Sequence, residues 1–493
     1  MRVTQNKNLF VYDVIRIIGV FLLAVLIFFP YSFGSLLPFL VVVATTIITV
    51  GTLEYGIYGP LYFLVILIPY SQSVSIFSLG DREVNLGMHT IVIGYIIIMM
   101  SFVKGFKIKK VKEPSTRVLL ILGLWTLLTI LISLFFRSSG VTNSLVTWVR
   151  WIQFIPIVCI LISSDIDLKH IKNFVKILIY LGFITSIWGI FEVLNPTELT
   201  SRAFRGAVSF TRPLFRELNL ASSFQENGFY KGSANYNVSG AFMVVIFFIS
   251  LPFLKSKSLF SKNRISLLLI MLLIVGIAVT KSRSSIIAFI VGIAFYSYQY
   301  SFKRFLNILF LLLFVIVIFF SFFSEYWLGP MIIDTIYKLP SAISVVTLGD
   351  GWSSSMDFNT NVYGAAMRFV ALKEAFRIFL SSPIFGVGFY GFSSASILGT
   401  AENFYMQFLS ETGIIGLALL IRYYYYLWRK TKTKFPIGSF EDNFQIGFRS
   451  AFIVFLIVNM TGTLMYDTRI WGLMLILGAI QVYNVKMYNK NID

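Results

Sequence analysis

Charged residues are scarce in this sequence: they form 13% of its 493 residues, whereas hydrophobic residues form 57%. A soluble domain has roughly 25% charged and about 45–50% apolar residues, so the composition excludes a soluble globular protein. A helix needs about 20 apolar residues to cross a membrane. The sequence therefore predicts an all-α polytopic membrane protein, whose hydrophobic residues suffice for about 14 transmembrane helices.

Cysteine and histidine are almost absent. The single cysteine, Cys159, lies in an apolar run, which excludes a disulfide within the chain and a four-cysteine metal site. The two histidines, His89 and His170, fall on opposite sides of the membrane in the topology predicted below and cannot share a metal. Asp165-Ile166-Asp167 matches the Asp-x-Asp of metal-dependent nucleotide-sugar enzymes, but its short connection leaves no room for a nucleotide domain. We therefore expect no metal and no cofactor.

Acidic residues are also few, 22 against 41 basic ones, which gives a net charge of +19. In a soluble protein this excess would suggest a nucleic-acid partner. Here the positions decide: when the apolar runs are numbered alternately, one set of connections holds 22 basic residues and the short connections of the other set hold 5. Cytoplasmic loops collect Lys and Arg, so the first set and both termini are predicted to be cytoplasmic. No nucleic-acid partner is expected.

Fourteen apolar runs are the candidate membrane spans. They lie at residues 14–30, 36–53, 57–72, 88–104, 117–137, 145–164, 171–194, 237–255, 264–281, 284–301, 304–324, 408–428, 445–465 and 468–486. In the second and third runs, Gly56, Gly59 and Pro60 leave open a single broken or re-entrant segment.

Two long connections divide this series, and both are predicted to lie on the outer side of the membrane. The resulting regions are helices 1–7 in 1–194, a first large outer loop at 195–236, helices 8–11 in 237–324, a second large outer loop at 325–407, and helices 12–14 in 408–493. Neither loop has the composition of a disordered tail. We expect both to be ordered.

The second outer loop contains a predicted amphipathic helix, Gly364–Leu380. Arg368 flanks one side of its apolar stripe, and Lys373 and Arg377 flank the other. The stripe consists of Phe369, Leu372, Phe376, Phe379 and Leu380. Such a helix lies in the membrane interface, where its cations contact either ordinary lipid headgroups or an anionic substrate.

A glycine-rich turn follows this helix. Gly386, Gly388 and Gly391 match the letters of the GxGxxG dinucleotide motif, but no strand precedes them, so a dinucleotide site is not expected. Two alternatives remain open: a plain turn, or a turn whose backbone N–H groups approach an anion.

Four short motifs, taken together and in this order, resemble the O-antigen ligase and polymerase family. Thr280–Ser284 resembles its Ser-x-Arg element with a shift of one residue, and Arg368-x-x-x-Leu372 its Arg-x-x-x-Leu element. Pro383-x-x-Gly386-x-Gly388 is similar to its Pro-x-x-Gly-x-Gly turn. In the last motif, Glu402 takes the place of a His, Asn403 that of an amide, and Gly413 and Gly416 close the pattern.

This resemblance implies the C-type membrane glycosyltransferase architecture and a metal-independent glycosyltransferase. Its substrate would be undecaprenyl-pyrophosphate-linked oligosaccharide at the outer face of the bacterial cytoplasmic membrane, with a chain-length regulator as a protein partner. Because the ligase branch uses His where this chain has Glu402, the resemblance favours a polymerase of O-antigen, capsule or exopolysaccharide repeat units. The alternatives are a ligase that transfers finished polymer to another acceptor, and a lipid-linked oligosaccharide flippase or other transporter.

Residue roles follow from this chemistry. A leaving pyrophosphate needs cations, and Arg forms bidentate phosphate contacts, so Arg283 and Arg368 are the catalytic candidates for this task. Glu402 is the candidate general base for the acceptor hydroxyl, the alternative being a helix-capping carboxylate. Glu411, about two and a half turns further on, is expected to be structural or a second proton acceptor. The candidate substrate-binding residues are Arg150, which lies inside a span, Arg205, Arg212, Arg377, Asn403 and Asn237.

Overall fold

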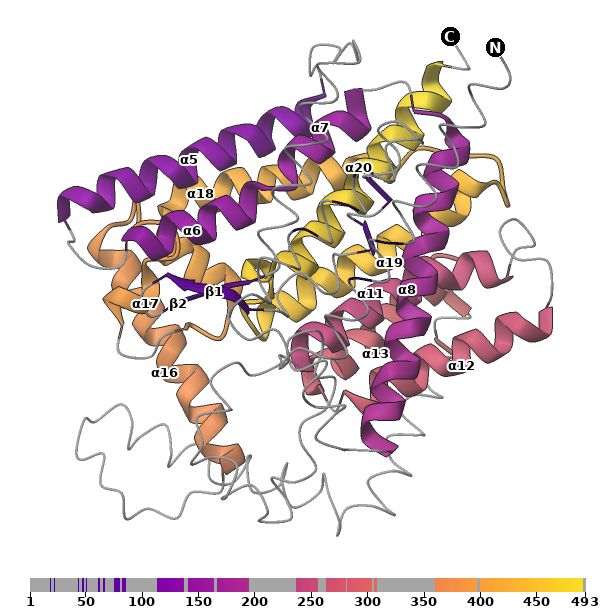
Figure 1. The fold of residues 1–493 in the computed structure, drawn as a ribbon, viewed down its shortest axis with the longest axis horizontal. Helices are drawn as coiled ribbons and strands as arrows, with labels where there is room; N and C mark the ends of the chain where they lie inside the picture. Colours follow the sequence, from indigo (N-terminus) through magenta and orange to yellow (C-terminus); the bar gives the residue numbers. More distant parts are fainter. Residues whose placement is uncertain are drawn as a thin grey trace.

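The computed structural model describes residues 113–136, 141–163, 166–194, 236–255, 263–280, 282–303, 360–396 and 400–490, a hairpin at 75–79 and 82–85, and a few isolated positions. The regular elements in these residues are helices apart from the hairpin, in which β1 (Ser75–Leu79) pairs antiparallel with β2 (Arg82–Asn85), a small addition to the all-α prediction (Figure 1). Within the described residues, six helical stretches are long and apolar enough to cross a membrane. The chain is therefore a multi-pass membrane protein.

Apolar helices in the described residues agree with nine of the predicted apolar runs. They are α5 (Pro114–Phe136), α6 (Val141–Ile152), α7 (Ile155–Ser163), α8 (Leu168–Leu194), α11 (Tyr236–Lys255), α12 (Asn263–Val279), α13 (Arg283–Tyr298), α18 (Phe404–Lys430), α19 (Phe440–Met460) and α20 (Thr468–Lys490). The predicted runs at 14–30, 36–53, 57–72, 88–104 and 304–324 lie wholly or mostly outside the described residues.

The predicted run 145–164 is divided rather than continuous. It ends as α6 at Ile152 and resumes as α7 at Ile155. Pro156 explains the interruption, because its ring would clash with the carbonyl of Ile152 in an unbroken helix and it has no N–H to donate.

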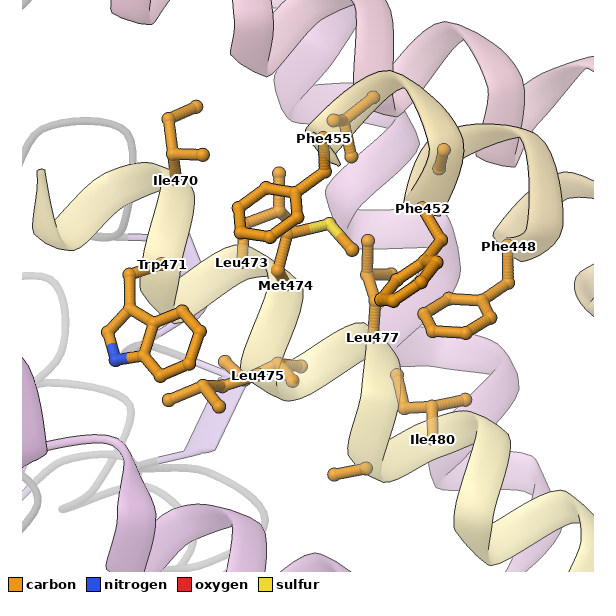
Figure 2. Packing of buried hydrophobic residues seen from close by; sticks show 14 of the residues in the cluster. Phe448, Phe452, Phe455, Ile470, Trp471, Leu473, Met474, Leu475, Leu477 and Ile480 are labelled. Carbon is orange, nitrogen blue, oxygen red and sulfur yellow. The ribbon is translucent and has the colours of Figure 1, made fainter. Parts of the chain in front are cut away.

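The core of the bundle lies around α20. Residues Thr468–Val485 of this helix are buried on every side. Phe452 and Phe455 of α19 point toward Leu477 and Met474 of α20 (Figure 2). A helix that is covered all round in this way belongs to the interior of a bundle.

The α5 helix differs from α20 because one of its faces is uncovered. From residue 120 onward its exposed residues are all large and aliphatic: Leu120, Ile121, Leu124, Leu128, Leu131 and Leu134. An apolar face without protein neighbours is what a helix in contact with lipid presents. The contrast with α20 places α5 at the edge of the bundle formed by the described helices.

One end of the bundle, where α18 and α20 begin and α19 ends, is here called the cap end. One long helix and two short ones lie there. They are α16 (Thr360–Ser381), α17 (Phe392–Ala395) and the 3₁₀ helix η5 (Leu464–Tyr466). The α16 helix extends away from the bundle (Figure 1). At the opposite end, Lys430 Nζ pairs with Glu113 Oε1 at 3.0 Å, and Lys486 Nζ donates to the carbonyl of Ile162 at 2.8 Å.

The helix predicted at 364–380 is confirmed, with bounds slightly wider than predicted. It packs through small and aliphatic residues: Ala375 and Ile378 form a buried cluster with Val387, Phe392 and Ala401. The predicted apolar stripe turns away from this cluster, because Phe369, Phe376 and Leu380 are all exposed. The stripe therefore does not form the packing face of the helix.

Candidate functional site

Arg368 and Glu402, predicted as the cation and the general base, lie together at the cap end. Arg368 Nε is 3.9 Å from Glu402 Oε2, and their side chains are 53% and 46% exposed. Thr400 Oγ1 also donates to Glu402 Oε1 at 3.3 Å. A long, exposed ion pair is weakly held, so both groups are open to a substrate.

Glu402 does not cap α18. The N-cap is Asn403, whose Oδ1 accepts from the N–H of Met406 at 3.0 Å, and whose Nδ2 donates to the carbonyl of Met460 at 2.8 Å. The capping alternative for Glu402 is therefore wrong. Both ends of the Asn403 amide serve the junction of α18 with α19, and its contact with substrate stays a prediction.

Glu402 also has an uncommon backbone conformation, with φ at 54°. The left-handed region costs a residue with a side chain about 1–2 kcal/mol. Such residues gather at functional sites, where the surrounding structure holds them. At Glu402 this conformation occurs just before α18, which begins at Phe404.

The α18 helix is interrupted at Gly413, where φ is 67° and ψ is −174°. The interruption frees backbone groups, and the turn after α16 bonds to them. Val387 N donates to Ser410 O at 3.0 Å, Gly388 N donates to Glu411 O at 2.9 Å, and Ile414 N donates to Pro383 O at 2.9 Å. A broken helix is tolerated in a membrane protein when neighbouring groups satisfy the backbone in this way.

Glycines allow this contact between two backbones. A side chain at Gly386 would overlap the backbone of Glu411, and one at Gly413 would overlap the carbonyl of Ile384. Both glycines also have positive φ, which favours glycine. The Pro-x-x-Gly-x-Gly turn and Gly413 of the last motif therefore pack directly against each other.

Glu411 lies beneath this contact and is fully buried. Its Oε2 accepts from Tyr390 N at 2.8 Å and from the Tyr466 hydroxyl. Its Oε1 accepts from Phe392 N at 3.2 Å and from Gln407 Nε2 at 2.9 Å. The glycine-rich turn does present backbone N–H groups to an anion, and that anion is the carboxylate of Glu411.

Tyr466 is held as a donor in this arrangement. Burial, followed by the nearby Glu411 carboxylate, raises the pKa of the Tyr466 phenol well above its usual value. Its ring lies 5.4 Å from that of Phe389 and 5.3 Å from that of Phe404, centroid to centroid. The hydroxyl therefore remains protonated and fixed.

The predicted Ser-x-Arg element forms a second cluster with Asn237. Ser282 Oγ donates to Asn237 Oδ1 at 2.8 Å, and Ser284 Oγ does so at 3.4 Å. Ser282 also caps α13 by accepting from Ser285 N. Arg283 is thereby the first residue of α13, but its side chain lies outside the described residues, as do Arg205 and Arg212.

Arg150 lies in the last turn of α6 and is partly buried. The next residue, Trp151, stacks on Trp471 of α20 at 4.9 Å and lies 5.3 Å from the ring of Phe389. Arg150 therefore lies beside an aromatic contact that joins α6, α20 and the turn.

Arg377 pairs with Glu374 on its own helix. Arg377 Nε donates to Glu374 Oε2 at 2.8 Å, and Nη2 donates to Oε1 at 2.6 Å. The Arg377 side chain is nevertheless 67% exposed, so one face of its guanidinium is accessible.

Part of the chain that contains this site is similar to a known family. Residues 268–421 match the family model described as O-antigen ligase. This segment of the chain is similar to that family. The family covers O-antigen ligases and polymerases, membrane proteins that act on lipid-linked polysaccharide. Comparison with curated proteins gave no significant match.

The matched segment includes Arg283, Arg368 and Glu402. Glu411 was expected to be structural or a second proton acceptor, but its partners in the turn were not predicted. The ion pair of Asp467 with Arg469 was not predicted either; its Nη2 lies 2.7 Å from Oδ2, and both side chains are under 10% exposed.

A metal centre is not formed by the part of the chain that the structure describes. Within it, no three His, Cys, Asp or Glu side chains lie close enough together to hold a metal ion.

Proposed function

We propose that this protein is a polymerase that joins undecaprenyl-pyrophosphate-linked oligosaccharide repeat units into O-antigen, capsule or exopolysaccharide chains. The reaction would take place at the outer face of the bacterial cytoplasmic membrane. The observation that carries the proposal is the exposed pair of Arg368 with Glu402 at one end of a membrane-helix bundle.

The chemistry assigns one step to each member of the pair. The acceptor hydroxyl oxygen bonds to the anomeric carbon of the donor sugar as the bond from that carbon to pyrophosphate breaks. Glu402 takes the hydroxyl proton, and Arg368 stabilises the negative charge that develops on the leaving undecaprenyl pyrophosphate. No metal is assigned a step in this proposal.

Other predicted residues take supporting roles in the proposal. Arg283 is the first residue of α13 and follows Ser282, which donates to Asn237; it is proposed as a second phosphate contact. The exposed Phe369, Phe376 and Leu380 of α16 support a position in the membrane interface, close to a lipid-linked substrate. The proposed substrate contacts are Arg150, Arg205, Arg212, Arg377, Asn237 and Asn403.

The family description favours one alternative, a ligase that transfers finished polymer to a different acceptor. The replacement of His by Glu402 supports the polymerase. A transporter is the third candidate.

An assay with purified protein in lipid distinguishes these three functions. Supplied only with undecaprenyl-pyrophosphate repeat units and a chelator, a polymerase releases undecaprenyl pyrophosphate and forms a ladder of longer lipid-linked chains. A ligase consumes the donor only when a different acceptor is added, and a transporter moves the lipid across the bilayer without changing its length. Either of the last two results would contradict the proposal. A chain-length regulator is expected to set the length of the ladder, not its formation.

The proposed orientation can be tested with two exposed positions. Ser393 lies on α17 at the cap end, and Ile437, which is 98% exposed, lies in the Lys-rich connection between α18 and α19. In a Cys159→Ser background, Ser393→Cys is expected to react with a membrane-impermeant thiol reagent in intact cells, and Ile437→Cys is not. The reverse pattern would place the candidate site in the cytoplasm.

A further inference from the structure

Glu411 is a buried carboxylate that the proposed reaction does not use. We infer that Glu411 is a positioning residue, which holds the turn after α16 against α18 and η5 and thereby sets the placement of Arg368 relative to Glu402. The activity part of this inference rests on the proposed function.

One chain of contacts leads from Glu411 to Arg368. Its Oε1 accepts from the N–H of Phe392, whose buried ring packs in a cluster with Ala375 and Ile378 of α16. Arg368 lies about two turns before Ala375 on the same helix. A shift of Phe392 therefore displaces the surface against which α16 packs, and with it the position of Arg368.

A second chain leads from Glu411 to Glu402. Gln407 Nε2 donates to Glu411 Oε1, and Gln407 Oε1 accepts from Ala401 N at 3.1 Å. Ala401 is fully buried and directly precedes Glu402. Glu411 is thus the point at which the supports of both proposed catalytic residues meet.

A third contact ties this point to the connection between α19 and α20. The Tyr466 hydroxyl donates to Oε2, and the Tyr466 ring lies 5.7 Å from that of Tyr390. Tyr390 has φ at 59°, an uncommon conformation for a residue with a side chain, and its N–H also donates to Oε2.

An amide cannot replace this carboxylate. Each oxygen of Glu411 accepts one backbone N–H, from Phe392 at Oε1 and from Tyr390 at Oε2. Whichever way a Gln side chain were turned, its NH₂ group would face a backbone N–H. Glu411→Gln therefore loosens the turn while keeping the size of the side chain.

The test compares Glu411→Gln and Tyr466→Phe with Tyr424→Phe. Tyr424 is also a buried tyrosine whose hydroxyl reaches η5, but it donates there to the sulfur of Met465. The first measurement is kcat and KM for chain extension. The second is the reaction of a cysteine at Ala375, fully buried in the cluster, with a thiol reagent in a Cys159→Ser background.

We expect Glu411→Gln to lower kcat on the order of 10²-fold, as a misplaced catalytic group does, with a smaller change in KM. Tyr466→Phe is expected to lower kcat by roughly 10-fold, since one of the four bonds is lost. Both variants should increase the labelling of Ala375→Cys, and Tyr424→Phe should change neither measurement.

The inference is overturned if Ala375→Cys stays protected in both test variants, or if it becomes labelled while kcat remains that of the Tyr424→Phe control. If Glu411→Gln fails to fold, Tyr466→Phe decides by the same two criteria. If the unaltered protein makes no ladder, the proposed function has failed, and protection of Ala375→Cys alone then decides whether Glu411 holds the turn.

Discussion

Two glutamates near the start of α18 differ in almost every physical respect. Glu402 is 46% exposed and makes a 3.9 Å ion pair with Arg368, whereas Glu411 is fully buried and accepts hydrogen bonds from four groups. A group that takes a proton from substrate needs access and a free lone pair. A group that supports the fold needs its partners satisfied. The comparison distinguishes Glu402, the proposed reactive residue, from the buried contacts that hold it in place. These contacts, made by Glu411, Tyr466, the turn after α16 and the break of α18 at Gly413, are here called the frame.

Two ion pairs at the cap end repeat this difference. Asp467 and Arg469 are buried and joined by short bonds, whereas Arg368 and Glu402 are exposed and further apart. The first pair belongs to the frame beside Tyr466, and the second pair is accessible to substrate.

The largest expected effect comes from breaking the frame at Gly413. Gly413→Ala places a methyl group into the carbonyl of Ile384 at a positive φ, so we expect a loss of more than about 4 kcal/mol of stability. Yield of monodisperse protein and its thermal unfolding in detergent measure the effect.

Gly438→Ala is the matched control, because Gly438 also has a positive φ but no atom lies near its added methyl group. It should cost only about 1–2 kcal/mol. Equal losses from the two variants would mean that backbone conformation alone, and not the contact between the turn and α18, requires glycine at 413.

The two ion pairs give the next largest effect. Arg469→Met leaves the Asp467 carboxylate buried without its cation, which costs about 3–5 kcal/mol. Arg368→Met removes an exposed pair, for which at most about 1 kcal/mol is expected. Thermal unfolding measures the stability that each variant loses. A greater loss from Arg368→Met would mean that the Arg368–Glu402 pair, and not the Asp467–Arg469 pair, supports the fold.

The smallest effect depends on pH. The hydrogen bond from Arg377 lowers the pKa of the Glu374 carboxyl in the folded protein. This pair therefore stabilises the fold above the ordinary carboxyl pKa of about 4.3, and the contribution disappears as the pH falls through the lowered value.

Glu374→Gln should reduce stability by about 0.2–0.5 kcal/mol at neutral pH, and this loss should shrink as the pH falls through the lowered pKa of Glu374. Thermal unfolding of the parent and the variant at neutral and at acid pH provides the comparison. A difference that persists at the acid pH would have a cause other than this ion pair.

Much of the fold could be predicted because its signals are local. Apolar runs identify the described membrane helices, and the periodicity of residues 364–380 identifies α16. The division of one run at Pro156 follows from the same local rules but was not predicted. The packing face of α16 could not be found from hydrophobicity, because it uses the small Ala375 while the larger Phe369 and Phe376 are exposed.

The site was predictable in part. Motif order indicated that Arg368 and Glu402 belong together. Asn403 was predicted as a substrate contact, although its capping role follows the known preference of Asn at helix starts. The partners of Glu411 could not be predicted, because two are backbone N–H groups of a turn and another is Tyr466, which lies 55 positions later in the chain. Such contacts depend on the fold, not on local sequence.

The most direct test of the central claim is chain extension by Glu402→Gln. The account predicts a loss on the order of 10²-fold in the ladder assay, with thermal unfolding and the protection of Ala375→Cys unchanged, because Glu402 is exposed and lies outside the frame. A near-normal ladder from Glu402→Gln, at matched amounts of folded protein, would contradict the assignment of Glu402 as the general base.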